Sequence, residues 1–185
     1  MPASTIHDVK HLSQAMEKSK HDLNAFTPIY ETFAGRIYSY CRHRVGSSQD
    51  AEDLTAEIFA RAMSKCHTYR GGSVGAWLFR IAYHMTVDFY RSKKVTTVSD
   101  EVLNTMSDTG QRSPLEIVIQ KERQGLLQEL VDSLTEEKRN LLLLRITGEL
   151  SSAEIGEIVG KNAGSVRVEL HRIIQELKLN AVEEQ

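Results

Sequence analysis

Two residues able to exchange protons, His84 and Asp88, lie four positions apart in the stretch WLFRIAYHMTVDFYR. If this stretch is helical, the spacing puts both side chains on one face, where a carboxylate can orient an imidazole as a general base. An enzyme site would add a nucleophile, a phosphate-binding loop or a metal, and the sequence shows no motif for any of them. We therefore predict no catalytic residues and no enzyme; a hydrolase screen tests the alternative.

A second possible chemistry is metal binding, because the chain holds two cysteines and seven histidines. They form three close pairs: Cys41 with His43, Cys66 with His67, and His7 with His11. Thiolates and imidazoles are zinc ligands, but the spacing within these pairs differs from that of zinc knuckles. Two thiols are also too few for a disulfide framework. We expect free cysteines, no metal and no cofactor; zinc analysis of the purified protein tests the alternative of a metal sensor.

Charge is distributed unevenly along the 185 residues, although the net charge is only −2. Residues 25–95 carry ten basic and six acidic side chains, whereas residues 114–180 carry nine basic and eleven acidic ones. Any affinity for a polyanion must therefore be local to particular faces. No apolar run approaches the ~20 residues that cross a bilayer, and the amino-terminal segment lacks the apolar core of a secretory signal. We expect a cytoplasmic protein without membrane insertion.

Helices are the elements that would position these groups. A first helix is predicted by one apolar stripe at helical spacing: Phe26, Ile29, Tyr30, Phe33, Ile37, Tyr40 and Cys41. After the break at Gly46, Ser48 can cap a second helix that opens with acids and buries Leu54, Ile58 and Met63.

A glycine-rich loop separates the second helix from a third. Gly71, Gly72 and Gly75 weaken any helix across them. From Trp77 onward the apolar stripe consists of Leu78, Ile81, Ala82, Met85 and Phe89. The three helices predict a small bundle.

A second helical unit follows a stretch without helical periodicity. Residues 92–113 are rich in Ser, Thr, Asp and Asn and predict a linker. Helical spacing resumes after Pro114 and continues through Leu134. Ser133 or Thr135 can cap the next helix.

The carboxy-terminal part has the pattern of a helix-turn-helix. Ser151 and Glu154 have the spacing of a capping box, and Gly156 allows two helices to approach closely. Gly160 permits a tight turn, Asn162 can cap the following helix, and that helix buries Val166 and Leu170. We predict an all-α fold of two small helical domains. The predicted boundaries are an extension at 1–24, a first domain at 25–95, a flexible linker at 96–113, a second domain at 114–180 and a tail at 181–185.

Three motifs together resemble the extracytoplasmic-function (ECF) sigma factors, the small promoter-recognition subunits of bacterial RNA polymerase. They are AEDLTAEIFARA, WLFRIAYHMTVDFYR and the helix-turn-helix, and the resemblance covers about residues 26–95 and 114–179. It implies a sigma domain two followed by a sigma domain four. The implied function is to bind core polymerase, recognise the minus-thirty-five and minus-ten elements, promote DNA melting and start transcription of a specific regulon under the control of an anti-sigma factor.

The resemblance implies two contacts with the polymerase. The acidic helix would bind the clamp helices of the largest subunit, and the second domain would bind the flap of the second-largest subunit. The implied contact residues of the acidic helix are Asp50, Glu52, Asp53, Leu54, Glu57 and Phe59. Exposed carboxylates beside apolar side chains make a mixed surface suited to a basic helical hairpin, although the family usually has Gln where Ala56 stands.

The resemblance also implies contacts with promoter DNA. The loop from Cys66 to Gly75 would trap a flipped base of the minus-ten element, and the third helix would contact the separated strand. The implied residues are Tyr69, Arg70, Arg80, Tyr83, His84, Asp88, Arg91 and Lys94. For the minus-thirty-five duplex they are Arg167, Val168, His171 and Arg172. The family commonly has Asn in place of His84 and a basic residue in place of Glu169.

Two further points stay open at this stage. A helix-turn-helix regulator that acts without polymerase would explain residues 114–179 but would leave the acidic helix without a role. Residues 1–24, with three charges of each sign and weak apolar spacing at Val9, Leu12 and Met16, form either a disordered leader or an interaction helix.

Overall fold

A computed structural model describes residues 4–45, 47–94, 131 and 133–183, and within these residues all regular structure is helical. The predicted all-α fold class is confirmed for this part of the chain. The predicted linker at 96–113 lies outside the described residues, as do residues 114–130 of the helix expected between Pro114 and Leu134. Residues 92–94, which the low-periodicity stretch at 92–113 included, are helical and end α4.

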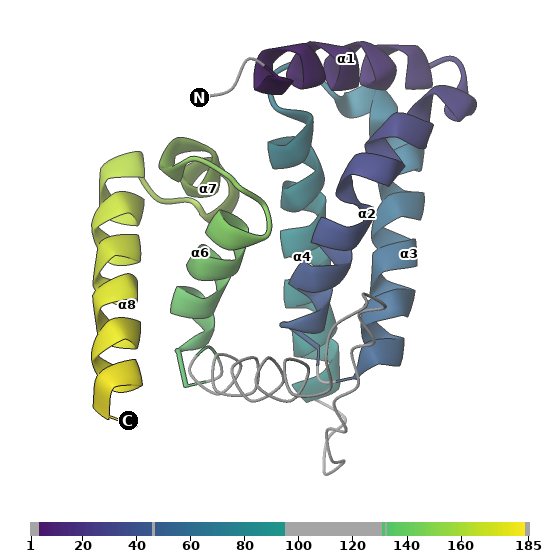
Figure 1. Cartoon of the computed structure of the whole chain (residues 1–185). Helices are drawn as coiled ribbons and strands as arrows, with labels where there is room; N and C mark the ends of the chain where they lie inside the picture. The colour runs from purple at the N-terminus through teal and green to yellow at the C-terminus, as the bar shows by residue number, and fades with distance from the viewer. Residues whose placement is uncertain (1–3, 46, 95–130, 132, 184–185) are drawn as a thin grey trace, which may run out of the picture.

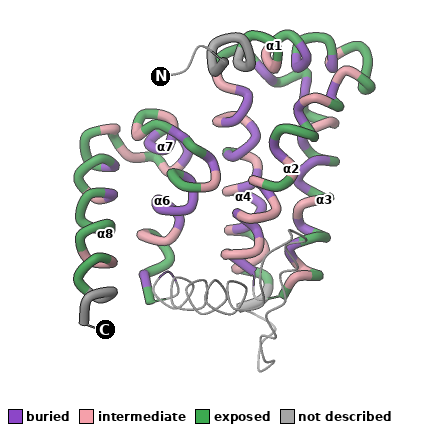
Figure 2. The backbone as a smooth tube through the Cα atoms, in the orientation of Figure 1, coloured by how far each residue is buried: buried purple, intermediate pink, exposed green. Residues whose placement is uncertain are grey.

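The described helices form two groups that lie side by side (Figure 1). The first group contains α1 (Ser4–Ser19), the short 3-10 helix η1 (Leu23–Phe26), α2 (Thr27–Arg42), α3 (Ser48–Lys65), the short η2 (Cys66–Thr68) and α4 (Val74–Lys94). The second group contains α6 (Glu136–Ile146), α7 (Ser152–Val159) and α8 (Ala163–Glu183). Helix α7 contacts α4, and buried positions run along α2, α3, α4 and α6 (Figure 2).

Helix α2 buries the predicted stripe with one exception. Ile29, Phe33, Ile37 and Tyr40 are buried, but Tyr30 is 52% exposed. Each helical residue is rotated by about 100° from the one before it, so Tyr30 lies at the edge of the stripe. Its inclusion in the core was wrong.

Helix α3 begins one residue earlier than its predicted cap implies. The hydroxyl of Ser47, not of Ser48, accepts a hydrogen bond from the Asp50 backbone N–H at 3.0 Å. The extended backbone of Ser47 suits a capping residue. Leu54 and Ile58 are buried as predicted, whereas Met63 is only half-buried.

Helix α4 buries a wider face than the predicted stripe. Leu78, Ala82 and Met85 are buried, and so is Phe79, which the stripe did not include. The Phe79 ring packs edge-on against Tyr40 of α2, with ring centres 5.7 Å apart. Trp77, Ile81 and Phe89 are half-buried. Because α4 packs against α2 and α3 and also against α7, one stripe cannot describe its contacts.

The amino-terminal extension forms helix α1, which lies across the end of the bundle (Figure 1). Met16 and Ala15 are buried against the bundle. Of the two alternatives for residues 1–24, the structure therefore supports a packed helix over Ser4–Ser19.

The local signals of the helix-turn-helix are confirmed. Ser151 and Glu154 form the reciprocal capping box, and Gly160 ends α7 with a left-handed backbone at φ 76°. The Asn162 side chain accepts a hydrogen bond from the Ser165 N–H at 2.8 Å. A methyl group at Gly156 would overlap the Lys161 carbonyl oxygen, so the close approach requires glycine.

The capping box predicts a measurable loss of stability. Replacing Ser151 with alanine removes the hydroxyl that accepts from the Glu154 N–H, and lost caps of this kind cost about 1 kcal/mol. We expect the free energy of unfolding to fall by that amount in urea denaturation. Ser152→Ala, one position inside the helix, should change it by less than about 0.5 kcal/mol.

The same box predicts a pH dependence. Burial of the Glu154 carboxyl opposes its ionisation, but hydrogen bonds from Ser151 and from the Ser73 hydroxyl outweigh burial and hold the pKa of Glu154 below 4.5. Because the folded pKa is the lower one, this stabilisation is present above the unfolded pKa and disappears as the pH falls through the folded pKa. The difference between the wild type and Ser151→Ala should therefore shrink below about pH 4. An unchanged difference at low pH would contradict this assignment.

Candidate nucleic-acid and polymerase interfaces

One side of α4 presents most of the predicted strand-contacting residues together. Arg80, His84, Asp88 and Arg91 are exposed and follow one another at helical spacing. Tyr83 is half-buried, with its ring 5.4 Å from that of His84 in an edge-on arrangement. The side chain of Lys94 lies outside the described residues. This face combines cations with an aromatic ring, as single-strand binding surfaces do.

The loop between α3 and α4 places its two candidate residues differently. Arg70 is exposed, and its guanidinium donates a hydrogen bond to the His67 carbonyl oxygen at 3.1 Å. Tyr69 is 1% exposed, and its hydroxyl donates to the Gly72 carbonyl oxygen at 2.7 Å. Tyr69 is thus placed to hold the loop rather than to contact a base, which corrects its predicted role.

Helix α3 presents an acidic face, but the two apolar side chains predicted to border it are buried. Glu52, Asp53 and Glu57 are exposed and Asp50 is half-buried. Leu54 and Phe59 are each 4% exposed because they complete the bundle core. The mixed surface predicted from these two side chains is therefore wrong.

An aromatic ring does border the acidic helix, but it comes from α2. Tyr30 is exposed and packs edge-on against Phe59, with ring centres 4.8 Å apart. Sequence analysis missed it because its spacing also fitted the apolar stripe of α2.

Helix α8 presents all four predicted duplex-contacting residues on its exposed side: Arg167, Val168, His171 and Arg172. Glu169 stands where the family often has a basic residue. Its carboxylate is paired with the Lys161 ammonium at 2.8 Å. Lys161 also pairs with Glu137 at 2.6 Å, and the hydrogen bonds that Lys161 donates to Glu137 and Glu169 raise the pKa of Lys161. The negative charge of Glu169 is thus partly neutralised by Lys161, within the second helical group.

Three arginines of the first group bind the second group. Arg36 donates to the carbonyl oxygens of Thr147, at 2.9 Å, and Gly148 at the end of α6. The fully buried Arg44 side chain pairs with Glu136 at 3.0 Å.

The third arginine, Arg80, is also a predicted strand contact. It pairs with Glu157 of α7 at 3.1 Å, so this arrangement of the two groups occupies part of the α4 face. Sequence analysis missed this contact because it joins residues that are far apart in the chain.

Cys41 and Cys66 are free and buried, and burial raises the pKa of the Cys41 thiol to about 11. Among the described residues no group of three or more His, Cys, Asp or Glu side chains could hold a metal ion. No described helix combines the length and the apolar character that a bilayer span requires.

Comparison with protein families identifies both helical groups. The Sigma-70 region 2 family matches residues 29–96, and the Sigma-70, region 4 family matches residues 124–177. ECF RNA polymerase sigma factor SigW of Bacillus subtilis is 31% identical over 162 residues, which cover 83% of this chain and 87% of SigW. SigD of Mycobacterium tuberculosis, also an ECF RNA polymerase sigma factor, is 30% identical over 186 residues, covering 96% of this chain and 86% of SigD. The chain belongs to the ECF sigma factor family.

Solved structures share the fold. CnrH in complex with the cytosolic domain of CnrY matches with a TM-score of 0.68 and 16% identity, over 96% of this chain and 99% of CnrH. The sigma factor RpoE of Bartonella quintana, in complex with the anti-sigma factor NepR, matches with a TM-score of 0.65 and 16% identity, over 83% of this chain and 94% of RpoE.

Proposed function

We propose that this chain is an alternative sigma factor that binds core RNA polymerase in the cytoplasm and directs it to a specific set of promoters. The proposal rests on one observation: this member of the ECF family has an exposed acidic face on α3 and exposed basic faces on α4 and α8. The domain boundaries at 25–95 and 114–180 are part of this proposal.

In the proposed mechanism, α3 docks on the polymerase. The carboxylates of Glu52, Asp53 and Glu57 pair with basic side chains of the clamp helices in the largest subunit. Such charge complementarity speeds association and fixes the register of the complex. The second domain would bind the flap of the second-largest subunit.

The minus-ten element is proposed to bind along α4 and the loop after η2. Extruding a base from the duplex costs a few kcal/mol, which protein contacts with the base and the phosphates must offset. Arg70, Arg80 and Arg91 supply cations for the phosphates, and Tyr83 supplies a ring on which a base can stack. No nucleotide hydrolysis is required if these contacts hold the strand apart.

The minus-thirty-five element is proposed to bind α8 in the major groove. Arg167 and Arg172 can pair with guanine through two hydrogen bonds, which discriminates against other bases by about 1–3 kcal/mol. Val168 offers an apolar surface to a thymine methyl group.

Binding both elements requires the two helical groups to separate. The minus-thirty-five and minus-ten positions are about 25 base pairs apart, which is roughly 85 Å at 3.4 Å per base pair. A compact chain of this length has a radius of gyration of only about 16 Å. The exposed Arg80–Glu157 pair is worth at most about 1 kcal/mol. Separation also breaks the Arg36 hydrogen bonds and the pair of the buried Arg44 with Glu136, so contacts with polymerase and DNA must replace these as well.

Transcription in vitro with core polymerase on a promoter library tests the proposal. We expect a complex with core enzyme and initiation at promoters that share two separated sequence elements. A helix-turn-helix regulator that acts alone predicts no such complex. Absence of both the complex and initiation would overturn the proposed function.

We also propose that an anti-sigma factor controls the chain. Support comes from family membership and from the RpoE structure, which contains the anti-sigma factor NepR. Such a partner would cover the acidic face of α3 or the basic faces of α4 and α8. Affinity capture with the full-length chain as bait should recover a protein that blocks its binding to core polymerase.

A further inference from the structure

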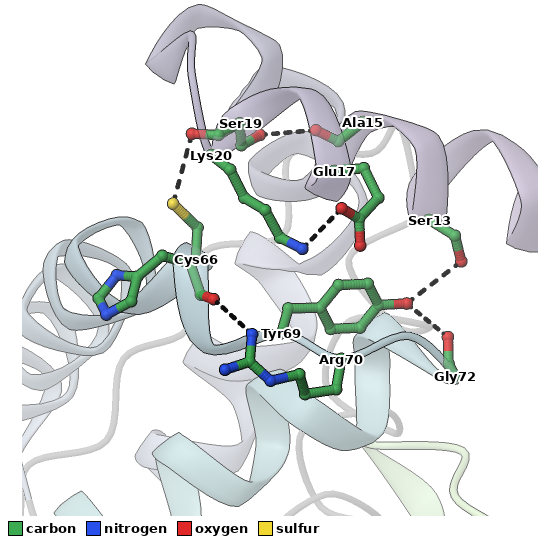
Figure 3. A network of polar contacts seen from close by, with 10 residues as sticks. Ser13, Ala15, Glu17, Ser19, Lys20, Cys66, Tyr69, Arg70 and Gly72 are labelled. Atoms are coloured by element: carbon green, nitrogen blue, oxygen red, sulfur yellow. Dashed lines mark hydrogen bonds and ion pairs between the residues drawn. The ribbon is translucent and has the colours of Figure 1, made fainter.

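Helix α1 is joined by a group of polar contacts to the loop from Cys66 to Gly75, the base-capturing loop of the proposed mechanism (Figure 3). The Cys66 thiol at the start of the loop donates to the Ser19 carbonyl oxygen at 3.3 Å. The Ser19 hydroxyl in turn donates to the Ala15 carbonyl oxygen at 2.7 Å. Cys66 and Ser19 are both buried, so these bonds are shielded from water.

Tyr69 makes the second connection. Its buried ring packs edge-on against Trp77, with ring centres 6.1 Å apart. Its hydroxyl donates to the Gly72 carbonyl oxygen, and the Ser13 hydroxyl of α1 lies 3.3 Å from the same phenolic oxygen. One tyrosine hydroxyl therefore joins the tip of the loop to the amino-terminal helix.

The tip of the loop depends on this hydroxyl for its shape. Gly71 and Gly72 have left-handed backbones with φ of 95° and 87°, and both are exposed. A methyl group built on either glycine would meet no atom within 4 Å. Glycine backbone is the most flexible in proteins and loses the most entropy when it is ordered. The hydrogen bond from Tyr69 to the Gly72 carbonyl oxygen is a contact that fixes this flexible backbone.

We propose that Ser13 and Tyr69 are positioning residues for minus-ten recognition and that α1 is part of the strand-capturing device. The Sigma-70 region 2 match begins at residue 29, so α1 lies outside it. The inference rests on the proposed function. A loop that is ordered before the strand arrives binds more tightly, because ordering a residue costs about 1–2 kcal/mol.

Two variants that remove single hydroxyls test this role, with all measurements on the polymerase holoenzyme. Tyr69→Phe removes the phenolic hydroxyl and keeps the buried ring. Ser13→Ala removes only the hydroxyl of the partner residue in α1. The probes are a single-stranded minus-ten oligonucleotide of the sequence selected from the promoter library and the same strand with an abasic site at the captured base. Tyr38→Phe, which removes a hydroxyl elsewhere in the bundle, is the matched control.

We expect Tyr69→Phe to weaken binding of the intact strand about five-fold and Ser13→Ala about two-fold, as net hydrogen-bond contributions imply. Binding of the abasic strand, affinity for core polymerase and the melting temperature should stay close to wild type. Ser13→Thr keeps a hydroxyl and should restore binding of the intact strand. Hydrogen exchange at Gly72 and Ser73 in the full chain should become several-fold faster in Tyr69→Phe.

Wild-type affinity of Tyr69→Phe for the intact strand would overturn the inference. Equal losses on the intact and abasic strands would also overturn it, because a general structural defect affects both. A wild-type chain that never joins core polymerase would overturn the proposed function and, with it, any role of the loop in strand capture. The first two results leave the proposed function standing.

Discussion

Replacing Gly156 with alanine is expected to destabilise the helix-turn-helix by about 2–3 kcal/mol, the upper part of the range of about 1–3 kcal/mol for overpacking. The added methyl group would overlap the Lys161 carbonyl oxygen and lie 3.5 Å from the Ala163 backbone nitrogen. Both atoms belong to the backbone of the turn, so they cannot move aside as a flexible side chain could. Urea denaturation of the full chain measures the loss.

The matched control is Gly35→Ala. Gly35 lies within α2, is exposed, and has no atom within 4 Å of an added methyl group. Alanine in a helix interior is favoured over glycine by about 1 kcal/mol, so this variant should be slightly more stable than wild type. Equal effects of the two substitutions would show that the Gly156 contact does not limit stability.

The Gly156 substitution should also separate two functions. The α7–α8 turn sets the orientation of the exposed side of α8, whereas the acidic face of α3 lies in the other helical group. We therefore expect Gly156→Ala to lose initiation at promoters that depend on the minus-thirty-five element and to lose much less of its affinity for core polymerase, because the contact of α3 with the clamp helices remains when the flap contact of the second domain is weakened. A parallel loss of polymerase affinity would contradict this division of roles.

Local signals explain why the helix-turn-helix could be predicted from the sequence. The Ser151–Glu154 box, the left-handed Gly160 and the Asn162 cap each depend on residues within about four positions. The stripe of α2 is likewise a local pattern, and only Tyr30 at its edge was misassigned.

Long-range packing explains what the sequence could not predict. Phe79 is buried because α2 supplies Tyr40 opposite it, and helical spacing in α4 alone does not show that neighbour. Arg36 binds the Thr147 carbonyl oxygen 111 positions away. The Tyr69 hydroxyl contacts that of Ser13, which lies in a helix that the family resemblance did not include.

The candidate interfaces show the same difference between what local sequence signals predict and what long-range packing decides. The family resemblance selected residues of α4 and of α8 that lie on exposed helix faces, and one helix face is a local property. The resemblance could not separate apolar residues that border a binding surface from those that complete the core. Helical spacing had placed Leu54 in the core, but the resemblance assigned both Leu54 and Phe59 to the polymerase surface, although the bundle needs both.

Reversing two charges on α3 should disrupt the complex with polymerase most strongly. Asp53 and Glu57 are four positions apart and exposed, so Asp53→Lys with Glu57→Lys converts one face from negative to positive. If this face meets basic clamp helices, like charges face each other across the interface at a cost of several kcal/mol. We expect affinity for core polymerase to fall at least about 100-fold, which corresponds to about 2.7 kcal/mol.

The chain itself should remain folded, because substitutions at exposed positions of this kind change stability by about 0.5 kcal/mol or less. Glu31→Lys, at an exposed position of α2, controls for a single charge reversal outside α3, with half the change in net charge, and should bind the polymerase within a few-fold of wild type. Affinities measured at two salt concentrations separate steering from contact, since exposed charges more than about 10 Å apart are screened at 0.1 M salt. A double variant that binds as tightly as Glu31→Lys at both concentrations would remove α3 from the polymerase interface.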